Sequence, residues 1–287
     1  MKFPARSVAL ALALALAWTL VSAAPAGAEE PASAPYDPAR FIPDLGWAAK
    51  TLGADTLFLL TSPLRFERED LLPLGIGAGA LAGAFLLDHE IRGKVKRHRD
   101  SLEDAADGVS YLGNAGVLFG LNVGLLAVGE GMREYRGDST LKDAALASTE
   151  AQLLSLAFTL GIRNVLGRSQ PREERGMGHF DPGSDGSFPS AHASQAFAVA
   201  TVLADRFGWD VGVPAYGLAS AVGFSRLALD KHWTADVVAG AFLGVLVGKA
   251  LSVRHRTSHG FLDFVPFVEP ETRTYGLALR IPLGAGR

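Results

Sequence analysis

The sequence predicts an all-α fold: a bundle of six helices, with a short β-hairpin at the C-terminus. Six apolar segments of 15 to 23 residues follow one another between residues 71 and 253, and each is long enough for four or more helical turns. Ala and Gly are abundant in these segments, which favours closely packed helices, either membrane-spanning or in the core of a soluble domain. The segments are Leu71–Leu87, Val109–Val128, Ala144–Leu166, Ala193–Phe207, Val211–Leu229 and Trp233–Val253.

Two further stretches flank the bundle. Residues 41–66 have the pattern of an amphipathic helix that ends near Pro63. Near the C-terminus, Tyr275, Leu277, Leu279 and Ile281 alternate with small or polar residues, which is the period of a β-strand. Together with the preceding FVPFVEPET sequence, this alternation predicts the hairpin, for which the sequence suggests no chemical role.

The N-terminus has the features of an export signal. Lys2 and Arg6 precede an apolar run over residues 8–21, and Ala26-Gly27-Ala28 has the A-x-A pattern of a signal-peptidase site. The chain therefore divides into a signal peptide (1–28), a linker with the amphipathic segment (29–66), a helical domain (67–256) and a C-terminal extension (257–287).

The composition excludes several classes of site. The 287 residues include no cysteine, which rules out disulfides, thiolate nucleophiles and zinc–thiolate centres. The formal charge of −3 gives no reason to expect a nucleic-acid partner. Membrane association is favoured by the apolar segments and by the basic KVKRHR sequence after the first one, although the mean hydropathy of +0.20 is low for a protein with many spanning helices.

The sequence SRLALDKHWTADVVAG, which begins at residue 225, places charged residues at the start of an apolar helix. His232 and Asp236 are four residues apart, so on a helix they share a face and can touch. A carboxylate that contacts an imidazole fixes its tautomer and stabilises its cation, as in many catalytic histidines. Arg226 lies six residues before His232, which is not a same-face interval, so we expect a turn at Asp230-Lys231.

A long polar loop rich in arginine separates the third and fourth apolar segments, and it ends on Pro189, Ser190 and His192 at the expected start of a helix. The free N–H groups of a helix N-terminus attract anions, and serine and arginine side chains add further donors. Phosphoryl transfer needs such an anion site, together with a nucleophile and an acid for the leaving oxygen. In this interpretation His232, braced by Asp236, is the nucleophile and His192 is the acid.

These motifs resemble those of the type 2 phosphatidic acid phosphatase superfamily, which includes bacterial class A acid phosphatases and vanadium haloperoxidases. The family motifs are Lys-x6-Arg-Pro, Pro-Ser-Gly-His and Ser-Arg-x5-His-x3-Asp. The resemblance covers roughly residues 144–253, and it implies the six-helix bundle of that family. The third motif is matched in full by Ser225, Arg226, His232 and Asp236, and the second by Pro189, Ser190 and His192, with Ala191 in place of the glycine.

The first motif is matched loosely. Arg163 stands at the lysine position, Gln170 at the arginine position and Pro171 at the proline position. Gln170 removes a guanidinium, for which Arg168 or Arg172 could substitute. The loss of a charged donor to a transition-state oxyanion costs about 2–4 kcal/mol, so the enzyme could be attenuated. Ala191 is harmless where the backbone has negative φ and costly where it needs positive φ.

The resemblance assigns a role to each matched residue. His232 would form a phosphohistidine, Asp236 would orient it, and His192 would protonate the leaving group. The phosphoryl oxygens would be held by Arg163, Gln170, Ser190, the Ala191 amide and Arg226, with Arg168 and Arg172 as substitutes.

The expected activity is metal-independent hydrolysis of a phosphomonoester or pyrophosphate, most reasonably lipid-linked, through the phosphohistidine. No cofactor is implied, and vanadate is expected as an inhibitor. Two alternatives stay open. One is a vanadium-dependent haloperoxidase with vanadate as its cofactor on His232. The other is a catalytically weakened, anion-binding envelope protein, an alternative that remains because Gln170 and Ala191 depart from the family motifs.

The expected partners are a phosphorylated lipid or small phosphoester and a membrane, with no nucleic acid. The expected location is the bacterial cell envelope, either at the membrane with a periplasm-facing site or soluble in the periplasm. With a cleaved signal and six spanning segments the motif loops would face the cytoplasm. A periplasmic site therefore needs one more crossing, such as Phe41–Leu60, or one fewer.

Overall fold

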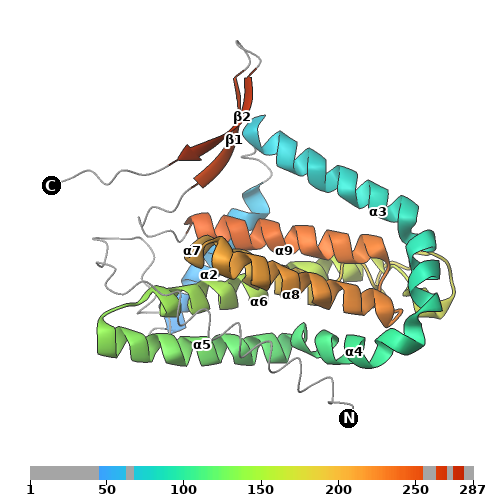
Figure 1. Cartoon of the computed structure of the whole chain (residues 1–287), viewed down its shortest axis with the longest axis horizontal. Helices are drawn as coiled ribbons and strands as arrows, with labels where there is room; N and C mark the ends of the chain where they lie inside the picture. The colour runs from blue at the N-terminus through green and yellow to red at the C-terminus, as the bar shows by residue number, and fades with distance from the viewer. Residues whose placement is uncertain (1–44, 63–67, 255–262, 270–273, 281–287) are drawn as a thin grey trace. The chain divides into compact units, whose positions relative to one another are not determined.

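The structure is a computed structural model that describes residues 45–62, 68–254, 263–269 and 274–280 (Figure 1). The predicted signal peptide lies outside these residues. The described part of the chain contains eight α-helices and one two-stranded sheet, so the all-α prediction is confirmed. The elements are α2 (Leu45–Thr61), α3 (Leu71–Arg97), α4 (Arg99–Leu112), α5 (Ala115–Arg136), α6 (Thr140–Leu166), α7 (Ala191–Phe207), α8 (Trp209–Ala228), α9 (Thr234–Arg254), β1 (Asp263–Glu269) and β2 (Thr274–Arg280), with short 3₁₀ turns η3 (Arg68–Asp70) and η4 (Pro171–Glu173).

The predicted number of six helices is too low. The amphipathic segment forms α2, as expected. The second apolar segment, however, is not one helix, because the chain turns at Gly113 and Asn114 between α4 and α5. The Asn114 side chain caps α5 by accepting a 2.9 Å hydrogen bond from the Gly116 amide. Most of α4 is polar, so apolar periodicity did not reveal it.

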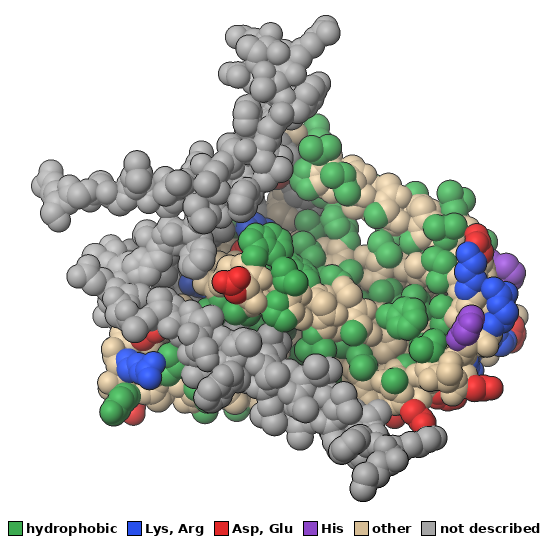
Figure 2. All heavy atoms as spheres, viewed as in Figure 1, with side chains coloured by type: hydrophobic (Ala, Val, Ile, Leu, Met, Phe, Trp, Pro, Cys, Tyr) green, Lys and Arg blue, Asp and Glu red, His purple; other side chains and the backbone are tan. Residues whose placement is uncertain are grey.

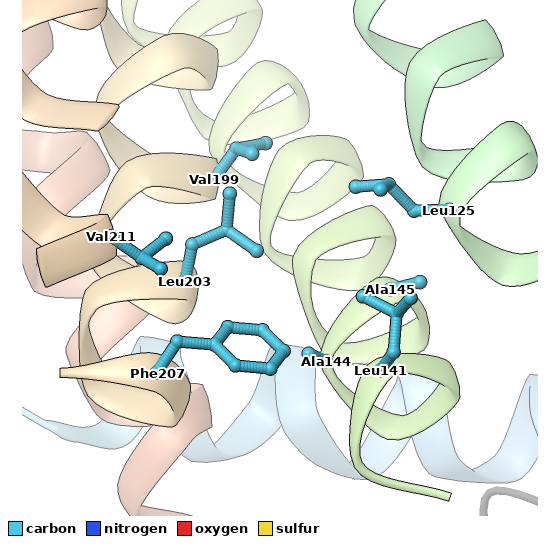
Figure 3. Packing of buried hydrophobic residues seen from close by; sticks show 8 residues of the cluster. All are labelled: Leu125, Leu141, Ala144, Ala145, Val199, Leu203, Phe207 and Val211. Carbon is cyan, nitrogen blue, oxygen red and sulfur yellow. The ribbon is translucent and has the colours of Figure 1, made fainter. Parts of the chain in front are cut away.

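One compact unit comprises residues 79–254, and α7 is its central helix, packed against α6, α8 and α9. Figure 3 shows part of its core, where α5, α6, α7 and α8 contribute aliphatic side chains and Phe207 to one cluster. Leu141 and Leu203 at its centre are almost completely buried. The removal of these side chains from water is the main favourable contribution to the packing of the four helices.

Helices α7 and α9 approach closely because α9 carries a glycine at every fourth position. A Cβ atom on Gly240 would lie 2.4 Å from the Ser190 carbonyl oxygen, and one on Gly244 would lie 2.2 Å from the Ser194 carbonyl oxygen. At Gly248 the corresponding distance to the Ala198 carbonyl oxygen is 2.7 Å. No side chain fits at these positions, so the glycines set the separation of the two helices that begin at the predicted motifs.

In the described part of the chain, four helices are long and apolar enough to cross a membrane: α3, α5, α6 and α9. Large apolar side chains on α3 and α5 are exposed, among them Leu86, Ile76 and Phe119. Exposed apolar surface on this scale is typical of contact with lipid. The protein therefore associates with a membrane.

The second compact unit contains α2, the first turns of α3 and the C-terminal strands. Strands β1 and β2 pair antiparallel, with Asp263 opposite Arg280 and Glu269 opposite Thr274. The predicted C-terminal hairpin is thus confirmed.

Candidate functional site

Three of the predicted motif segments meet at one end of the helical unit, where α6 and α8 end and α7 and α9 begin (Figure 1). The Ser190 amide at the start of α7 donates a 2.8 Å hydrogen bond to the Asp236 carbonyl oxygen in the first turn of α9. Arg226 Nη1 on α8 donates to the Ser110 hydroxyl on α4. The first of these contacts brings the second and third motifs together, and the second joins Arg226 to α4.

The turn expected at Asp230-Lys231 is confirmed. Helix α8 ends at Ala228, and Asp230 adopts a positive φ of 55°. His232 lies two residues before α9 rather than on it, yet its Nδ1 is 3.5 Å from Asp236 Oδ2. Because Nδ1 faces the carboxylate, Nε2 is the imidazole nitrogen left to meet a substrate.

Besides its contact with His232, the Asp236 carboxylate is held in place by two groups. Its Oδ2 accepts a 2.8 Å hydrogen bond from the Trp233 amide, and its Oδ1 is 2.7 Å from Arg168 Nη1. Arg168 Nη2 lies 2.7 Å from Oδ2 of Asp88 on α3, whose Oδ1 accepts a 2.8 Å hydrogen bond from the Ala235 amide. The side chains of Asp236, Arg168 and Asp88 are completely buried. They form a carboxylate–guanidinium–carboxylate cluster that holds Asp236, and through it His232, in position.

The structure places Arg168 behind the site rather than in it. Besides its two carboxylate partners, Arg168 donates a 2.9 Å hydrogen bond from Nε to the Met177 carbonyl oxygen. Its guanidinium lies 4.7 Å from the centre of the Phe85 ring and 5.4 Å from that of Trp233. Every nitrogen of the guanidinium is therefore engaged, and the suggestion that Arg168 replaces the missing phosphate-binding arginine is corrected.

The start of α7 has the features expected of an anion site. Ser190 is the N-cap residue, and its buried hydroxyl has no hydrogen-bond partner among the described residues. Ala191 is the first helical residue, and among described residues other than glycine only Glu174 and Asp230 have positive φ. Alanine at the glycine position therefore causes no backbone strain.

Four cationic side chains lie at this end of the helical unit: Arg163, Arg172, Arg226 and Lys231. Burial, followed by the charges of Arg163 and Arg172, lowers the pKa of Arg226 to about 10. Lys231 has a pKa below its usual range, because it is partly buried and close to Arg226 and Arg172. Arg172 thus shares the site with Arg226, and it is the stronger candidate for the role that Gln170 cannot fill. Arg163 Nε donates a 2.6 Å hydrogen bond to the Gly186 carbonyl oxygen.

Both histidines are neutral in this environment. Burial, followed by the charges of Arg226, His232, Lys231 and Arg163, lowers the pKa of His192 to about 3. Burial also lowers the pKa of His232, although the Asp236 carboxylate acts in the opposite direction. A neutral His232 has a free lone pair on Nε2, which a nucleophile requires.

The sequence model of the PAP2 superfamily matches residues 145–259, the segment that carries Arg163, His192 and His232. The match spans 115 of the 287 residues, so this segment, which holds the predicted motifs, is similar to the PAP2 superfamily. This confirms the resemblance that the three motifs indicated.

Several individual proteins are similar to parts of the chain. The lipid A 1-phosphatase of Porphyromonas gingivalis is 42% identical over 67 residues, which are 22% of this chain and only 15% of that protein. The decaprenylphosphoryl-5-phosphoribose phosphatase of Mycobacterium tuberculosis is 27% identical over 152 residues, which are 52% of this chain and 78% of that protein. The crystal structure of a transmembrane PAP2-type phosphatidylglycerolphosphate phosphatase from Bacillus subtilis is 22% identical, with a TM-score of 0.41, and the match covers 71% of this chain and 93% of that one.

In the candidate site, four contributing residues lie outside the sequence-based prediction. Lys231 adds a positive charge, Ser110 accepts a hydrogen bond from Arg226, and Asp88 is paired with Arg168. Trp233 Nε1 donates a 2.9 Å hydrogen bond to the Ser169 carbonyl oxygen, which fixes the motif loop against α9. Asp88 directly follows an apolar segment, and an ionisable residue there is the one signal that could have drawn attention to it.

Gln170 lies at the start of η4, and its side chain is half-buried. Two residues later, the Arg172 amide donates a 3.3 Å hydrogen bond to the Asp230 carbonyl oxygen. The loosely matched first motif is therefore close to the third. No group of three or more His, Asp or Glu side chains suited to a metal ion occurs in the described part of the chain.

Proposed function

We propose that this protein is a phosphatase that hydrolyses a phosphomonoester or pyrophosphate carried by a lipid, through a phosphohistidine on His232 and without a metal ion. The observation that carries the proposal is a set of donors prepared for an anion that is not part of the chain. Ser190 Oγ and Arg226 Nε are both buried, and neither has a hydrogen-bond partner among the described residues. An unpartnered buried polar atom is costly, and a bound phosphoryl group would satisfy both.

The chemistry follows from the positions of the two histidines. His232 Nε2 attacks phosphorus, the bond from phosphorus to the leaving oxygen breaks, and the phosphoryl group is transferred to the imidazole. A protonated His192 gives its proton to the leaving oxygen, and Asp236 stabilises the cationic His232. The dianionic substrate offsets the surrounding cations, so its binding raises the pKa of His192, which then takes up a proton from solvent. Water then cleaves the phosphohistidine, with His192 acting as base.

The lipid-linked substrate is supported by two features. The exposed apolar helices of the described part of the chain support a site close to a membrane. The similar proteins are named as phosphatases of lipid A and of a decaprenyl-linked phosphoribose. The periplasmic orientation is part of the proposal, and the export-signal pattern of residues 1–28 supports it.

The test is phosphate release from short-chain phosphatidic acid and from a prenyl pyrophosphate, in excess EDTA, by the wild type, His232→Ala and His179→Ala. His179 is exposed in the motif loop and serves as the matched control. We expect release by the wild type and control, none by His232→Ala, and trapped radiolabelled phosphate on the protein only when His232 is present. Release that persists in His232→Ala, or that requires a divalent metal, would contradict the mechanism. Vanadate-dependent bromination of a dye would instead indicate the haloperoxidase chemistry.

A further inference from the structure

Helix α3 presents one charged face to the segments that carry the motifs. Asp88, Arg92 and Lys96 follow one another at intervals of four, so their side chains share one face of the helix. Asp88 contacts Arg168. Nitrogen atoms of Arg92 and Lys96 lie 2.8 Å and 3.2 Å from Oε1 of Glu174. A row of ion pairs therefore joins α3 to the end of the helical unit where α7 and α9 begin (Figure 1).

Arg92 also binds Asp230, in the turn between α8 and α9, through two parallel hydrogen bonds. Its Nε donates to Oδ1 at 2.8 Å, and its Nη2 donates to Oδ2 at 2.9 Å. The exposed fraction of the side chain is 16% for Arg92 and 8% for Asp230, so water has little access to the pair. A bidentate pair of this kind fixes the relative orientation of the two side chains.

The two carboxylate partners of Arg92 share an unusual backbone conformation. Among the described residues other than glycine, only Glu174 and Asp230 have a positive φ, of 57° and 55°. For a residue with a side chain this conformation costs about 1–3 kcal/mol, and it persists where surrounding contacts hold it. Because Arg92 donates to the carboxylates of both residues, it stabilises both turns.

The turn at Asp230 carries the proposed nucleophile. His232 follows Asp230 by two residues and precedes the first residue of α9 by two. The ring centre of Trp233, the next residue, lies 5.4 Å from the Arg92 guanidinium, a distance at which a cation and an indole ring attract each other. Arg92 thus contacts the chain on both sides of His232.

The turn at Glu174 carries Arg172. The Arg172 amide, two residues before Glu174, donates a 3.3 Å hydrogen bond to the Asp230 carbonyl oxygen. Arg92 adds a side-chain link between the same two turns, because its Nη2 donates to Oε1 of Glu174 and to Oδ2 of Asp230. The position of Arg172 relative to His232 therefore depends on Arg92.

We propose that Arg92 is a positioning residue for phosphoryl transfer, which aligns His232 with Arg172 by holding their two turns together. This inference rests on the proposed function, because the proposed function assigns the nucleophile to His232. Arg92 does not bind the phosphoryl group itself. Its Nε and Nη2 donate to carboxylates, and its Nη1 lies 3.5 Å from Glu174 Oε2.

The test is a single-turnover measurement with a saturating excess of protein over radiolabelled short-chain phosphatidic acid. The rate constant for transfer of the label to the protein does not depend on the folded fraction, so a loss of stability alone leaves it unchanged. We expect it to fall about tenfold in Arg92→Gln, because a misplaced nucleophile slows the chemical step. Arg97→Gln is the matched control, since Arg97 is exposed on the same helix, and its rate constant should equal that of the wild type. Arg92→Lys keeps the charge but cannot form the two parallel hydrogen bonds, so its rate constant should lie between those of Arg92→Gln and the wild type.

Asp230→Asn tests whether Arg92 acts through Asp230, because asparagine also tolerates a positive φ. It should slow the transfer as Arg92→Gln does, and the double variant should be no slower than the slower single variant. Effects that multiply in the double variant would overturn the inference. Rate constants in Arg92→Gln and Arg92→Lys equal to that of the wild type would also overturn it, and would leave the proposed function intact. If the wild type takes up no label, the proposed function fails and the inference fails with it.

Discussion

Replacing Asp88 with asparagine removes one of the two carboxylates that enclose Arg168, while the shape of the side chain is kept. The asparagine oxygen can still accept a hydrogen bond from the Ala235 amide, but its NH₂ group cannot balance the guanidinium 2.7 Å away. Breaking a buried ion pair by removing one partner costs about 3–5 kcal/mol. Because Arg168 retains Asp236, we expect a loss near the lower end, about 3 kcal/mol.

The assay is unfolding of the purified protein in mild detergent, with the midpoint compared between variants. Glu90→Gln is the matched control, since Glu90 lies two residues away on the same helix and pairs with Lys94 in solvent. We also expect a lower kcat with little change in KM for Asp88→Asn, because a loosened Arg168 positions Asp236, and hence His232, less well.

The reasoning would be refuted if Asp88→Asn shifted the midpoint no more than Glu90→Gln does. Asp88→Glu is a second check, because it restores the charge but not the length of the side chain. If charge balance is what matters, Asp88→Glu should recover part of the stability that Asp88→Asn loses.

Four further experiments address the site and its surroundings. Sulfate should bind more tightly as the pH falls from 8 to 5, because the anion raises the lowered pKa of His192 and its binding is accompanied by uptake of a proton. Thermal shift measures the binding, and in His192→Ala its dependence on pH should weaken. An equal pH dependence in both proteins would show that His192 is not the group that takes up the proton. Arg172→Gln should lower kcat/KM about a hundredfold through loss of a guanidinium, whereas Arg175→Gln in the same loop should not, and equal effects would remove Arg172 from the site. Gly240→Ala and Gly248→Ala should destabilise the packing of α7 against α9 to a similar extent, but only Gly240→Ala should reduce kcat, because it displaces the Ser190 carbonyl group. Equal kcat values in the two variants would show that the contact at Gly240 does not affect the site. Because the chain lacks cysteine, Arg175→Cys and Tyr135→Cys each provide a single thiol. If the site faces the periplasm, an impermeant maleimide should label Arg175→Cys in cells with a permeabilised outer membrane. Labelling of Tyr135→Cys alone would show that the site faces the cytoplasm.

The catalytic motifs could be predicted because their information is local. The four-residue interval from His232 to Asp236 and the turn at Asp230 both depend on neighbours in the chain, and both occur in the structure. His232 lies just before the helix, yet the contact with Asp236 forms, because a residue just before a helix can also reach its first turn.

Other features depend on contacts between distant segments and could not be predicted. Arg168 lies in a loop with other arginines, and only its partner Asp88, 80 residues earlier, draws it away from the phosphate site. The break at Gly113 was hidden inside an apolar run, because the reason for it is the proximity of Val222 and His192. The sequence shows that Gln170 stands where the family motif has an arginine, but it does not show that Arg172 lies near Arg226.

The cluster around Arg168 shows that the site cannot be separated from the helices that precede the motifs. The family match begins at residue 145, but Asp88, Ser110 and Gly113 all precede it. A fragment that starts at residue 145 would contain every motif residue and still leave the buried Arg168 with half of its counter-charge. The part of the chain that the site needs is therefore longer than the part that the family model matches, because α3 and α4 supply side chains that hold Arg168 and Arg226 in place.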